Sequence, residues 1–270
     1  MPLYIKPFGF IYMRVGFSLL LYAGIYFIWI KEKIEPKDIW RFIACGCFGI
    51  AFNQLLFFKG ISLTSTINAS LLMITTPIIT FVISRIILKE TMNFINIVGI
   101  LTGALGTSIL IFSSAKGVNH SNIEGDIYII LNAISYSIYL ILAKPLMKKY
   151  HPLTVIFMSF ATGFVVVSKV GYSEFTSIPW ETIPEINYLN ILFVVLMATF
   201  VVYLFNIAAM KAVSPTIVSS YIYVQPLFAI IISILFTQEK LTFNTFIGGI
   251  FIIFGLWLIN HVKLKQEIKL

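Results

Sequence analysis

Charged residues are scarce in this sequence of 270 residues. Asp, Glu, Lys and Arg make up 11% of it, whereas an ordinary soluble domain has about 25%. Hydrophobic residues account for 59%, above the roughly 45–50% of soluble domains. This composition excludes an ordinary soluble domain and predicts a polytopic membrane protein.

Cysteine and catalytic motifs are also sparse. The two cysteines, Cys45 and Cys47, lie two positions apart in one apolar segment, where their side chains face apart, so neither a disulfide nor a metal site is expected. The histidines fall in loops or at a helix end: His120, His151 and His261. No hydrolase or metalloprotease motif occurs, which disfavours an enzyme embedded in the membrane. No cofactor or metal ion is expected.

Long apolar segments dominate what is present. A helix needs about 20 apolar residues to cross a bilayer. Nine segments qualify: roughly 8–30, 42–60, 66–88, 94–113, 126–146, 153–171, 187–209, 215–237 and 243–261. The connections between them are too short to hold a soluble domain. The first segment lacks a signal-peptide cleavage site and is expected to remain as a helix.

The 19 lysines and arginines indicate the orientation of the chain. With Lys31, Lys33 and Lys37 placed in the cytoplasm, alternating spans put most of the other basic residues on the same side. The positive-inside rule then predicts a cytoplasmic C-terminus. The net charge of +8 is spread over loops and forms no basic patch, so no nucleic-acid partner is expected.

One stretch of the sequence occurs twice. Residues 65–110 match the residues 149 positions later without a gap: Ser65 with Ser214, Ser70 with Ser219, Pro77 with Pro226, Glu90 with Glu239, Phe94 with Phe243, Gly99 with Gly248 and Gly106 with Gly255. Weak internal repeats in a hydrophobic chain are typical of transporters built from duplicated halves, with the binding site between the halves.

The two copies are predicted to be inverted in the membrane. Alternation of spans places the Glu90 turn inside and the Glu239 turn outside, which requires an odd number of spans per half. The second half has five, but the first shows only four. Because residues 7–13 align with 152–158, the counterpart of span 126–146 is expected before Met1, as a helix missing through a misplaced start codon, truncation or loss.

The order and duplication of these motifs resemble the EamA-type family of the drug/metabolite transporter superfamily. The matching elements are Pro7 with Arg14, Ala69–Leu72 leading to Thr76-Pro77, Leu88–Glu90 and Gly99–Gly106, followed by Ser219-Ser220, Gln225-Pro226, Gln238-Glu239 and Gly248–Gly255. The resemblance implies an all-α membrane protein with two inverted five-helix repeats. The repeats are expected at residues 1–115, with four of five helices, and 124–270, with five. It also implies transport of a small metabolite.

Two central prolines predict kinks. Pro77 and Pro226 lack an N–H group, and their rings crowd the carbonyls of Met73 and Ile222. Each kink is expected to expose a backbone acceptor near mid-membrane. The prediction is that these positions take part in gating, and the alternative is a kink that serves packing alone.

Polar side chains inside the spans predict a central substrate cavity. Asn132, Ser135, Tyr136 and Tyr139 share one helical face, as do Thr199, Tyr203 and Asn206. Hydrocarbon drives such groups towards the bundle interior or a wet cavity. The predicted substrate-binding residues are Arg14, Asn53, Gln54, Thr75, Thr76, Asn132, Tyr136, Tyr139, Tyr203, Asn206, Tyr221 and Gln225. The alternative is hydrogen bonding between helices.

Arg14 is the one cation well inside a predicted span, about two turns from its outer end. Two roles are compatible with this position. The first is to hold an anionic group of the substrate. The second is to fix its own helix while the side chain extends to the outer interface.

The remaining repeated residues are expected to be structural. Glu90 and Glu239 precede glycine-rich helices, whose exposed N–H groups they would cap. Small residues on these helices permit close helix contact: Gly99, Gly103, Gly106, Gly248 and Gly255.

No Asp or Glu lies in the middle of a predicted span, which disfavours proton coupling through a central carboxylate. A neutral or zwitterionic metabolite resembling an amino acid fits best, moved outward across a bacterial inner membrane by alternating access. The partners are this metabolite and the lipid bilayer, and monomer and homodimer both remain open. The main alternative is a non-transporting membrane subunit or a truncated remnant of such a transporter.

Overall fold

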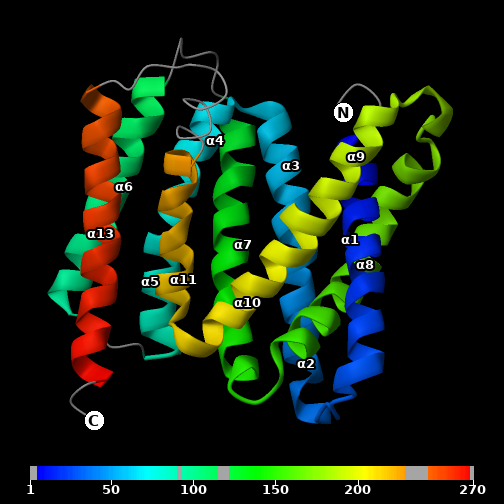
Figure 1. The fold of residues 1–270 in the computed structure, drawn as a ribbon, viewed down its shortest axis with the longest axis horizontal. Coiled ribbons are helices and arrows are strands. Elements are labelled where there is room, and N and C mark those ends of the chain that lie inside the picture. Colours follow the sequence, from blue (N-terminus) through cyan, green and yellow to red (C-terminus); the bar gives the residue numbers. More distant parts are fainter. Residues whose placement is uncertain (1–4, 90–92, 115–121, 229–242, 268–270) are drawn as a thin grey trace. The chain divides into compact units, whose positions relative to one another are not determined.

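The computed structural model describes residues 5–89, 93–114, 122–228 and 243–267, and every regular element in this part of the chain is a helix (Figure 1). The chain divides into two compact units. Unit 1 comprises Met1–Lys59 and Ile138–Val213, and unit 2 comprises Gly60–Ser137 and Ser214–Leu270. Each unit therefore combines segments of both predicted repeats.

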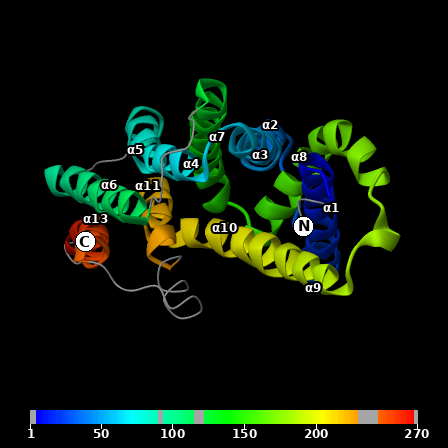
Figure 2. The same ribbon diagram turned by 90° about the horizontal axis from the view of Figure 1, so that it is seen from above.

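Unit 1 contains three whole membrane-length segments, most of a fourth and the end of a fifth. Its elements are α1 (Pro7–Ile25), η1 (Tyr26–Ile30), η2 (Pro36–Asp38), α2 (Ile39–Cys45), η3 (Gly46–Phe52), the start of α3 (Asn53–Leu63), the end of α7 (Ile123–Met147), α8 (Pro152–Thr176), η4 (Trp180–Thr182), α9 (Glu185–Phe193), η5 (Val194–Val201) and α10 (Val202–Ala212). Helices α1 and α8 lie side by side in both ribbon views (Figures 1 and 2). This contact packs α1, the first helix of the chain, against the rest of unit 1.

Unit 2 is built around a pair of long helices. Its elements are the end of α3, α4 (Thr66–Met73), α5 (Thr75–Ile87), α6 (Phe94–Ser114), the start of α7, α11 (Pro215–Ser220), η6 (Tyr221–Val224) and α13 (Phe243–Glu267). Helices α6 and α13 pack against each other (Figure 2).

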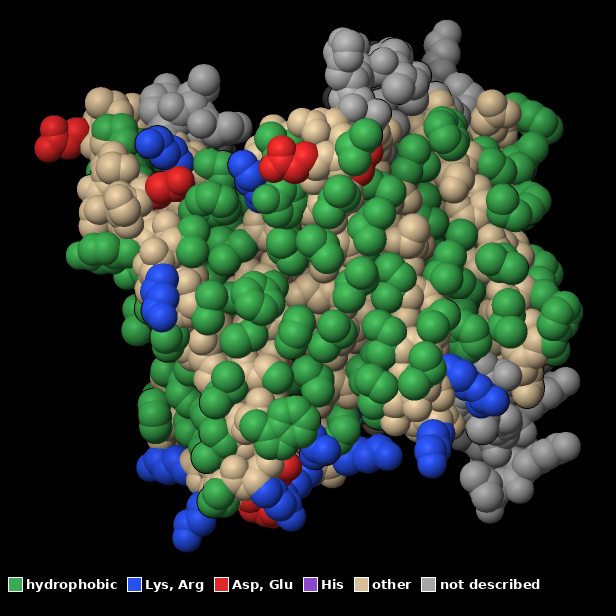
Figure 3. All heavy atoms as spheres, turned by 180° about the vertical axis from the view of Figure 1, so that it is seen from behind, with side chains coloured by type: hydrophobic (Ala, Val, Ile, Leu, Met, Phe, Trp, Pro, Cys, Tyr) green, Lys and Arg blue, Asp and Glu red, His purple; other side chains and the backbone are tan. Residues whose placement is uncertain are grey.

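Seven helical segments are long and apolar enough to cross a membrane. They are Pro7–Ile30, Pro36–Leu63, Asn68–Ile87, Phe94–Phe112, Ile123–Met147, Pro152–Thr176 and Glu185–Ala212. They match the first seven predicted spans. The eighth, 215–237, lies partly outside the described residues, and the ninth contains a shorter apolar helix, Phe246–Ile259. Hydrophobic side chains cover much of the surface in Figure 3, as expected for a protein whose solvent is lipid.

The pattern of helices repeats with the same offset as the sequence. Helix α4 begins at Thr66 and α11 at Pro215, while α6 begins at Phe94 and α13 at Phe243, each pair 149 positions apart. Segments 36–63 and 185–212 keep this offset, and both contain a π-helix, η3 or η5. Similar sequences have therefore folded into similar local structure.

Serine caps begin both copies of the proline-containing helix. Ser65 Oγ accepts a hydrogen bond from the Asn68 N–H at 3.1 Å, and Ser214 Oγ accepts one from the Ile217 N–H at 3.4 Å. A serine at this position satisfies a backbone donor that has no partner within the helix. These caps explain why both helices begin where they do.

The first copy breaks near its proline. Helix α4 ends at Met73, Ile74 lies in a turn, and α5 begins at Thr75, two residues before Pro77. The proline cannot donate a backbone hydrogen bond and crowds the preceding turn. The Thr75 hydroxyl donates to the Leu72 carbonyl at 2.6 Å. The break lies where the sequence predicts it, and a gating role for Pro77 stays a prediction.

The second copy of the proline-containing helix changes to 3-10 geometry just before its proline. Residues Tyr221–Val224 form a 3-10 helix immediately before Gln225 and Pro226. A change to 3-10 geometry within a helix often marks strain or a hinge. Both copies thus depart from α-helical geometry just before the repeated proline.

Glycines let α6 and α13 approach to backbone contact. A Cβ at Gly99 would lie 2.8 Å from the Gly255 carbonyl oxygen, and one at Gly106 would lie 2.7 Å from the Gly248 carbonyl oxygen. Such separations leave no room for a side chain. Gly103 instead faces the ring of Tyr223. In the structure, the five glycines expected to serve packing all lie at close contacts.

A carboxylate caps the first helix. Glu174 Oε2 accepts hydrogen bonds from the N–H groups of Phe8 and Gly9, both at 2.9 Å. The negative charge complements the partial positive charge at the start of α1.

Glu174→Gln is expected to lower the free energy of unfolding by about 1 kcal/mol, because the neutral amide accepts more weakly. The thermal unfolding midpoint of the detergent-solubilised protein measures this change, with exposed Glu181→Gln as the control. Equal midpoints for the wild type and Glu174→Gln would contradict the capping role.

Candidate functional site

Arg14 lies at the centre of a polar and aromatic cluster in unit 1. Its Nε donates a hydrogen bond to Thr199 Oγ1 at 2.9 Å. The guanidinium also lies 5.5 Å from the ring centre of Phe10 and 5.8 Å from that of Phe58, within the range of cation–π attraction. The side chain is half-buried inside the span Pro7–Ile30.

The charge of Arg14 is not neutralised by a carboxylate within the described chain. The only hydrogen bond of the guanidinium to the described residues is the one to Thr199, which leaves the terminal amino groups without a hydrogen-bond acceptor there. A cation at membrane depth costs several kcal/mol unless it is paired or reaches water. A forked donor of this kind matches a carboxylate with two parallel hydrogen bonds.

Thr199 owes its position to a π-helix. It lies in η5, a segment of wide helical turns, and its own hydroxyl donates to the Val194 carbonyl five residues earlier at 2.9 Å. The Phe200 carbonyl in the same segment accepts a hydrogen bond from the Tyr22 hydroxyl at 2.5 Å. π-helical turns are rare and frequent at functional sites. Here the wide turns supply both a hydroxyl and a carbonyl acceptor to α1.

Gln54 and Tyr203 add two further polar groups from equivalent positions of the repeat, 149 residues apart. Tyr203 lies within electrostatic range of Arg14 and beside Gln54. The amide of Gln54 is buried, and neither of its polar atoms forms a hydrogen bond of regular geometry among the described residues. A buried amide with unmet hydrogen-bonding capacity is costly in a purely structural role.

Aromatic rings line one side of the cluster. Tyr22 packs on Phe160 with ring centres 5.0 Å apart and stacks on Phe200 at 4.6 Å. Phe160 also meets Tyr203 edge to face at 5.3 Å. We call Arg14, Gln54, Thr199, Tyr203 and Tyr22 the arginine cluster. It offers one cation, hydroxyl and amide groups, and aromatic walls.

Three more predicted binding residues lie in unit 1. Asn53 is half-buried at the start of α3, and Asn206 is half-buried in α10. Tyr139 is fully buried, with its ring directly against Gly49. This packing gives Tyr139 a structural role, and its role in substrate binding stays a prediction.

The other predicted binding residues lie in unit 2. Thr76 is fully buried beside a hydrogen-bonded pair, Thr80 and Ser137, whose hydroxyl oxygens are 2.8 Å apart. Thr75 is half-buried, Asn132 is buried on α7, and Tyr136 is half-buried on the same helix. Tyr221 and Gln225 are exposed. The predicted set is thus divided between the two units.

Glu90 and Glu239 lie outside the described residues, so their capping role stays a prediction. Pro226 is half-buried just after η6. No group of three or more potential metal ligands occurs in the part of the chain that the structure describes.

Sequence reasoning missed several buried polar residues. Ser18 and Tyr22 follow Arg14 at spacings of four and eight residues and share its helix face, so helical periodicity could have found them. Tyr223 was also missed. Its hydroxyl donates to the Ile74 carbonyl at 3.3 Å, across the two proline-containing helices.

The fold and the arginine cluster define a polytopic membrane protein with a cation held inside its spans. The chain belongs to the EamA-like transporter family, whose model matches residues 1–112 and 123–261. The resemblance found in the sequence is thereby confirmed.

Similar proteins carry transporter names. A protein of Clostridium kluyveri named as an uncharacterized transporter is 25% identical, over 93% of this chain and 82% of that protein. A Bacillus subtilis protein named as the uncharacterized transporter YyaM is 27% identical, over 93% of this chain and 84% of that protein. A WAT1-related protein of Arabidopsis thaliana is 24% identical, over 91% and 74%. A solved crystal structure has the same fold, with a TM-score of 0.77, 15% identity and coverage of 95% of this chain and 89% of that one. The protein is a membrane transporter and not an enzyme.

Proposed function

We propose that this transporter moves a small zwitterionic metabolite resembling an amino acid outward across a bacterial inner membrane by alternating access, with its C-terminus in the cytoplasm. The observation that carries the proposal is Arg14, a cation inside a membrane span with no carboxylate partner among the described residues. A substrate carboxylate would supply the missing charge.

The neighbours of Arg14 support this substrate class. The hydrogen bond to Thr199 holds one side of the guanidinium, and its terminal amino groups remain available for a two-pronged contact. The buried amide of Gln54 and the hydroxyl of Tyr203 can bind further polar groups of the solute. A purely cationic drug would be repelled by this cluster.

The repeat supports alternating access. Both copies have the same order of helices and depart from α-helical geometry just before Pro77 or Pro226. The bias of basic residues favours opposite orientations of the two copies. Transporters of this kind rock one half against the other around a site near mid-membrane.

Counterflow into liposomes tests the proposal. Purified protein would be reconstituted in vesicles loaded with an unlabelled amino acid, and uptake of labelled solutes would be followed for amino acids, their decarboxylated amines and neutral sugars. Saturable exchange of amino acids without exchange of the amines is expected. Exchange of amines alone, or of no solute in the panel, would overturn the proposed substrate class.

A further inference from the structure

A shallow recess lies in unit 1 and shares no lining residue with the arginine cluster. It has a volume of about 480 Å³, and its lining is mostly polar. The residues that matter here are Glu32, Lys148, Lys149, Tyr150, His151 and Lys211. We call it the lysine recess.

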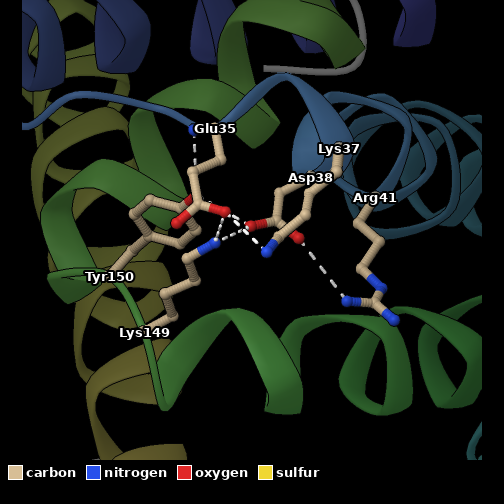
Figure 4. Close-up of polar contacts among 6 residues, drawn as sticks. All are labelled: Glu35, Lys37, Asp38, Arg41, Lys149 and Tyr150. Atoms are coloured by element: carbon tan, nitrogen blue, oxygen red, sulfur yellow. Dashed lines mark hydrogen bonds and ion pairs between the residues drawn. The ribbon is translucent and has the colours of Figure 1, made fainter.

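One wall of the recess is fixed by a network of ion pairs (Figure 4). Lys149 Nζ lies 2.5 Å from Glu35 Oε2 and 2.6 Å from Asp38 Oδ2. The Tyr150 hydroxyl donates to Asp38 Oδ2 at 2.8 Å and accepts from the Glu35 N–H at 3.1 Å. Asp38 is buried, and the network ties the turn between α7 and α8 to the start of α2.

The charges of this network satisfy one another. Hydrogen bonds from Lys149 and then Lys37 lower the pKa of the Glu35 carboxyl. Although desolvation opposes it, hydrogen bonding to Asp38, Glu35 and Tyr150 raises the pKa of the Lys149 ammonium. Lys149 is therefore committed to a structural role.

A second lysine fixes the end of α10, next to Lys211. Lys144 Nζ donates to the carbonyls of Met210 and Val213, at 2.5 and 2.7 Å. Both carbonyls belong to the end of α10, where a cation complements the helix dipole. This contact holds Lys211 at the edge of the recess.

Two ammonium groups at the recess have no such role. Lys148 and Lys211 are exposed, and the ammonium group of neither forms an ion pair or hydrogen bond with the described residues. The carboxylate of Glu32 is already engaged, since its Oε2 accepts from the His151 N–H at 2.9 Å. The recess therefore presents two unpaired positive charges on a preorganised frame.

Lys148 and Lys211 lie at the ends of membrane spans, and this position indicates which kind of anion they would meet. The candidate spans end at Met147 and Ala212, and the next begins at Pro152. Lys148 follows one span directly, and Lys211 is the second-last residue of another. Both positions fall at the membrane–water interface, where lipid phosphates lie. Figure 3 shows Lys and Arg side chains gathered along its lower edge.

We propose that the lysine recess binds the phosphate of an anionic phospholipid between Lys148 and Lys211. Basic pockets between membrane helices on the cytoplasmic side suit such headgroups. The lipid would bridge the ends of α7 and α10, which belong to the same unit. This site is independent of the substrate bound at the arginine cluster.

Native mass spectrometry of the detergent-solubilised transporter, titrated with phosphatidylglycerol or phosphatidylcholine, tests the proposal. Lys148→Gln/Lys211→Gln is expected to weaken phosphatidylglycerol binding about 30-fold, since each lysine near an anionic headgroup strengthens binding about fivefold. Lys148→Arg/Lys211→Arg should retain the lipid. Phosphatidylcholine should bind weakly to every variant.

A matched control separates the recess from general surface charge. Lys33→Gln/Lys89→Gln removes the same charge on the same predicted membrane face but outside the recess, and its phosphatidylglycerol affinity should equal that of the wild type. Equal loss in both double variants, or in neither, overturns the proposal. Glycerol phosphate is added as the soluble competitor. Displacement of phosphatidylglycerol by an equal concentration of glycerol phosphate would overturn the lipid assignment in favour of a soluble phosphate ester.

Discussion

Arg14→Met is expected to reduce exchange of carboxylate-bearing solutes by about 10- to 100-fold. The substitution keeps the length of the side chain but removes the cation, and hydrogen bonds to charged groups contribute about 1.5–3 kcal/mol. The loss should appear mainly as a raised half-saturation concentration, because the missing contact binds the substrate directly. Initial rates of amino-acid counterflow in liposomes, measured over a range of solute concentrations, provide the test.

Two companion variants separate binding from folding. Arg14→Lys retains the charge but not the planar fork, so an intermediate loss is expected. Thr199→Val removes the acceptor that orients the guanidinium and should weaken exchange less than Arg14→Met. Wild-type kinetics for Arg14→Met, at equal amounts of reconstituted protein, would remove the arginine cluster from the transport site.

Gly255→Val is expected to lower the free energy of unfolding strongly. A Cβ at Gly255 would lie 2.6 Å from the Gly103 nitrogen and 2.7 Å from the Gly99 carbonyl oxygen. These are backbone atoms and cannot rotate away, so α6 and α13 must separate. Overpacking of this kind costs about 1–3 kcal/mol. The thermal unfolding midpoint in detergent, followed by size-exclusion chromatography after heating, measures the effect.

Gly24 supplies the control for this substitution. No atom lies within 4 Å of a Cβ built at Gly24, which is exposed on α1. Gly24→Val therefore introduces the same side chain without a clash and should leave the midpoint close to that of the wild type. Similar midpoints for Gly24→Val and Gly255→Val would contradict the close contact of α6 and α13.

Much of the local fold was predictable because a helix that crosses a lipid bilayer must be long and apolar. Long apolar segments gave the seven described spans, and the 149-residue offset anticipated matching helix starts at Phe94 and Phe243. The π-helices η3 and η5 were not predictable. No residue type marks a π-turn, whereas proline and serine mark breaks and caps through their own chemistry.

The candidate site was predictable only in part. Arg14, Gln54 and Tyr203 stood out because polar groups are expensive within a span, and the structure places them in one unit. Helix periodicity reveals which residues share a face but not which faces meet. The bond between Arg14 and Thr199 joins residues 185 positions apart, so the contact depends on packing of α1 against η5 that sequence patterns do not encode.

Labelling of equivalent positions from the two sides of the membrane tests most directly the claim that the repeated halves face opposite ways. Lys37 and Ile186 are exposed residues 149 positions apart, each at the start of its copy of the same segment. Lys37→Cys and Ile186→Cys would be introduced separately into a background with Cys45→Ala and Cys47→Ala. An impermeant maleimide should label Ile186→Cys in intact cells and Lys37→Cys only in inverted vesicles. Labelling of both from the same side would contradict the inverted arrangement and, with it, alternating access by two opposed halves.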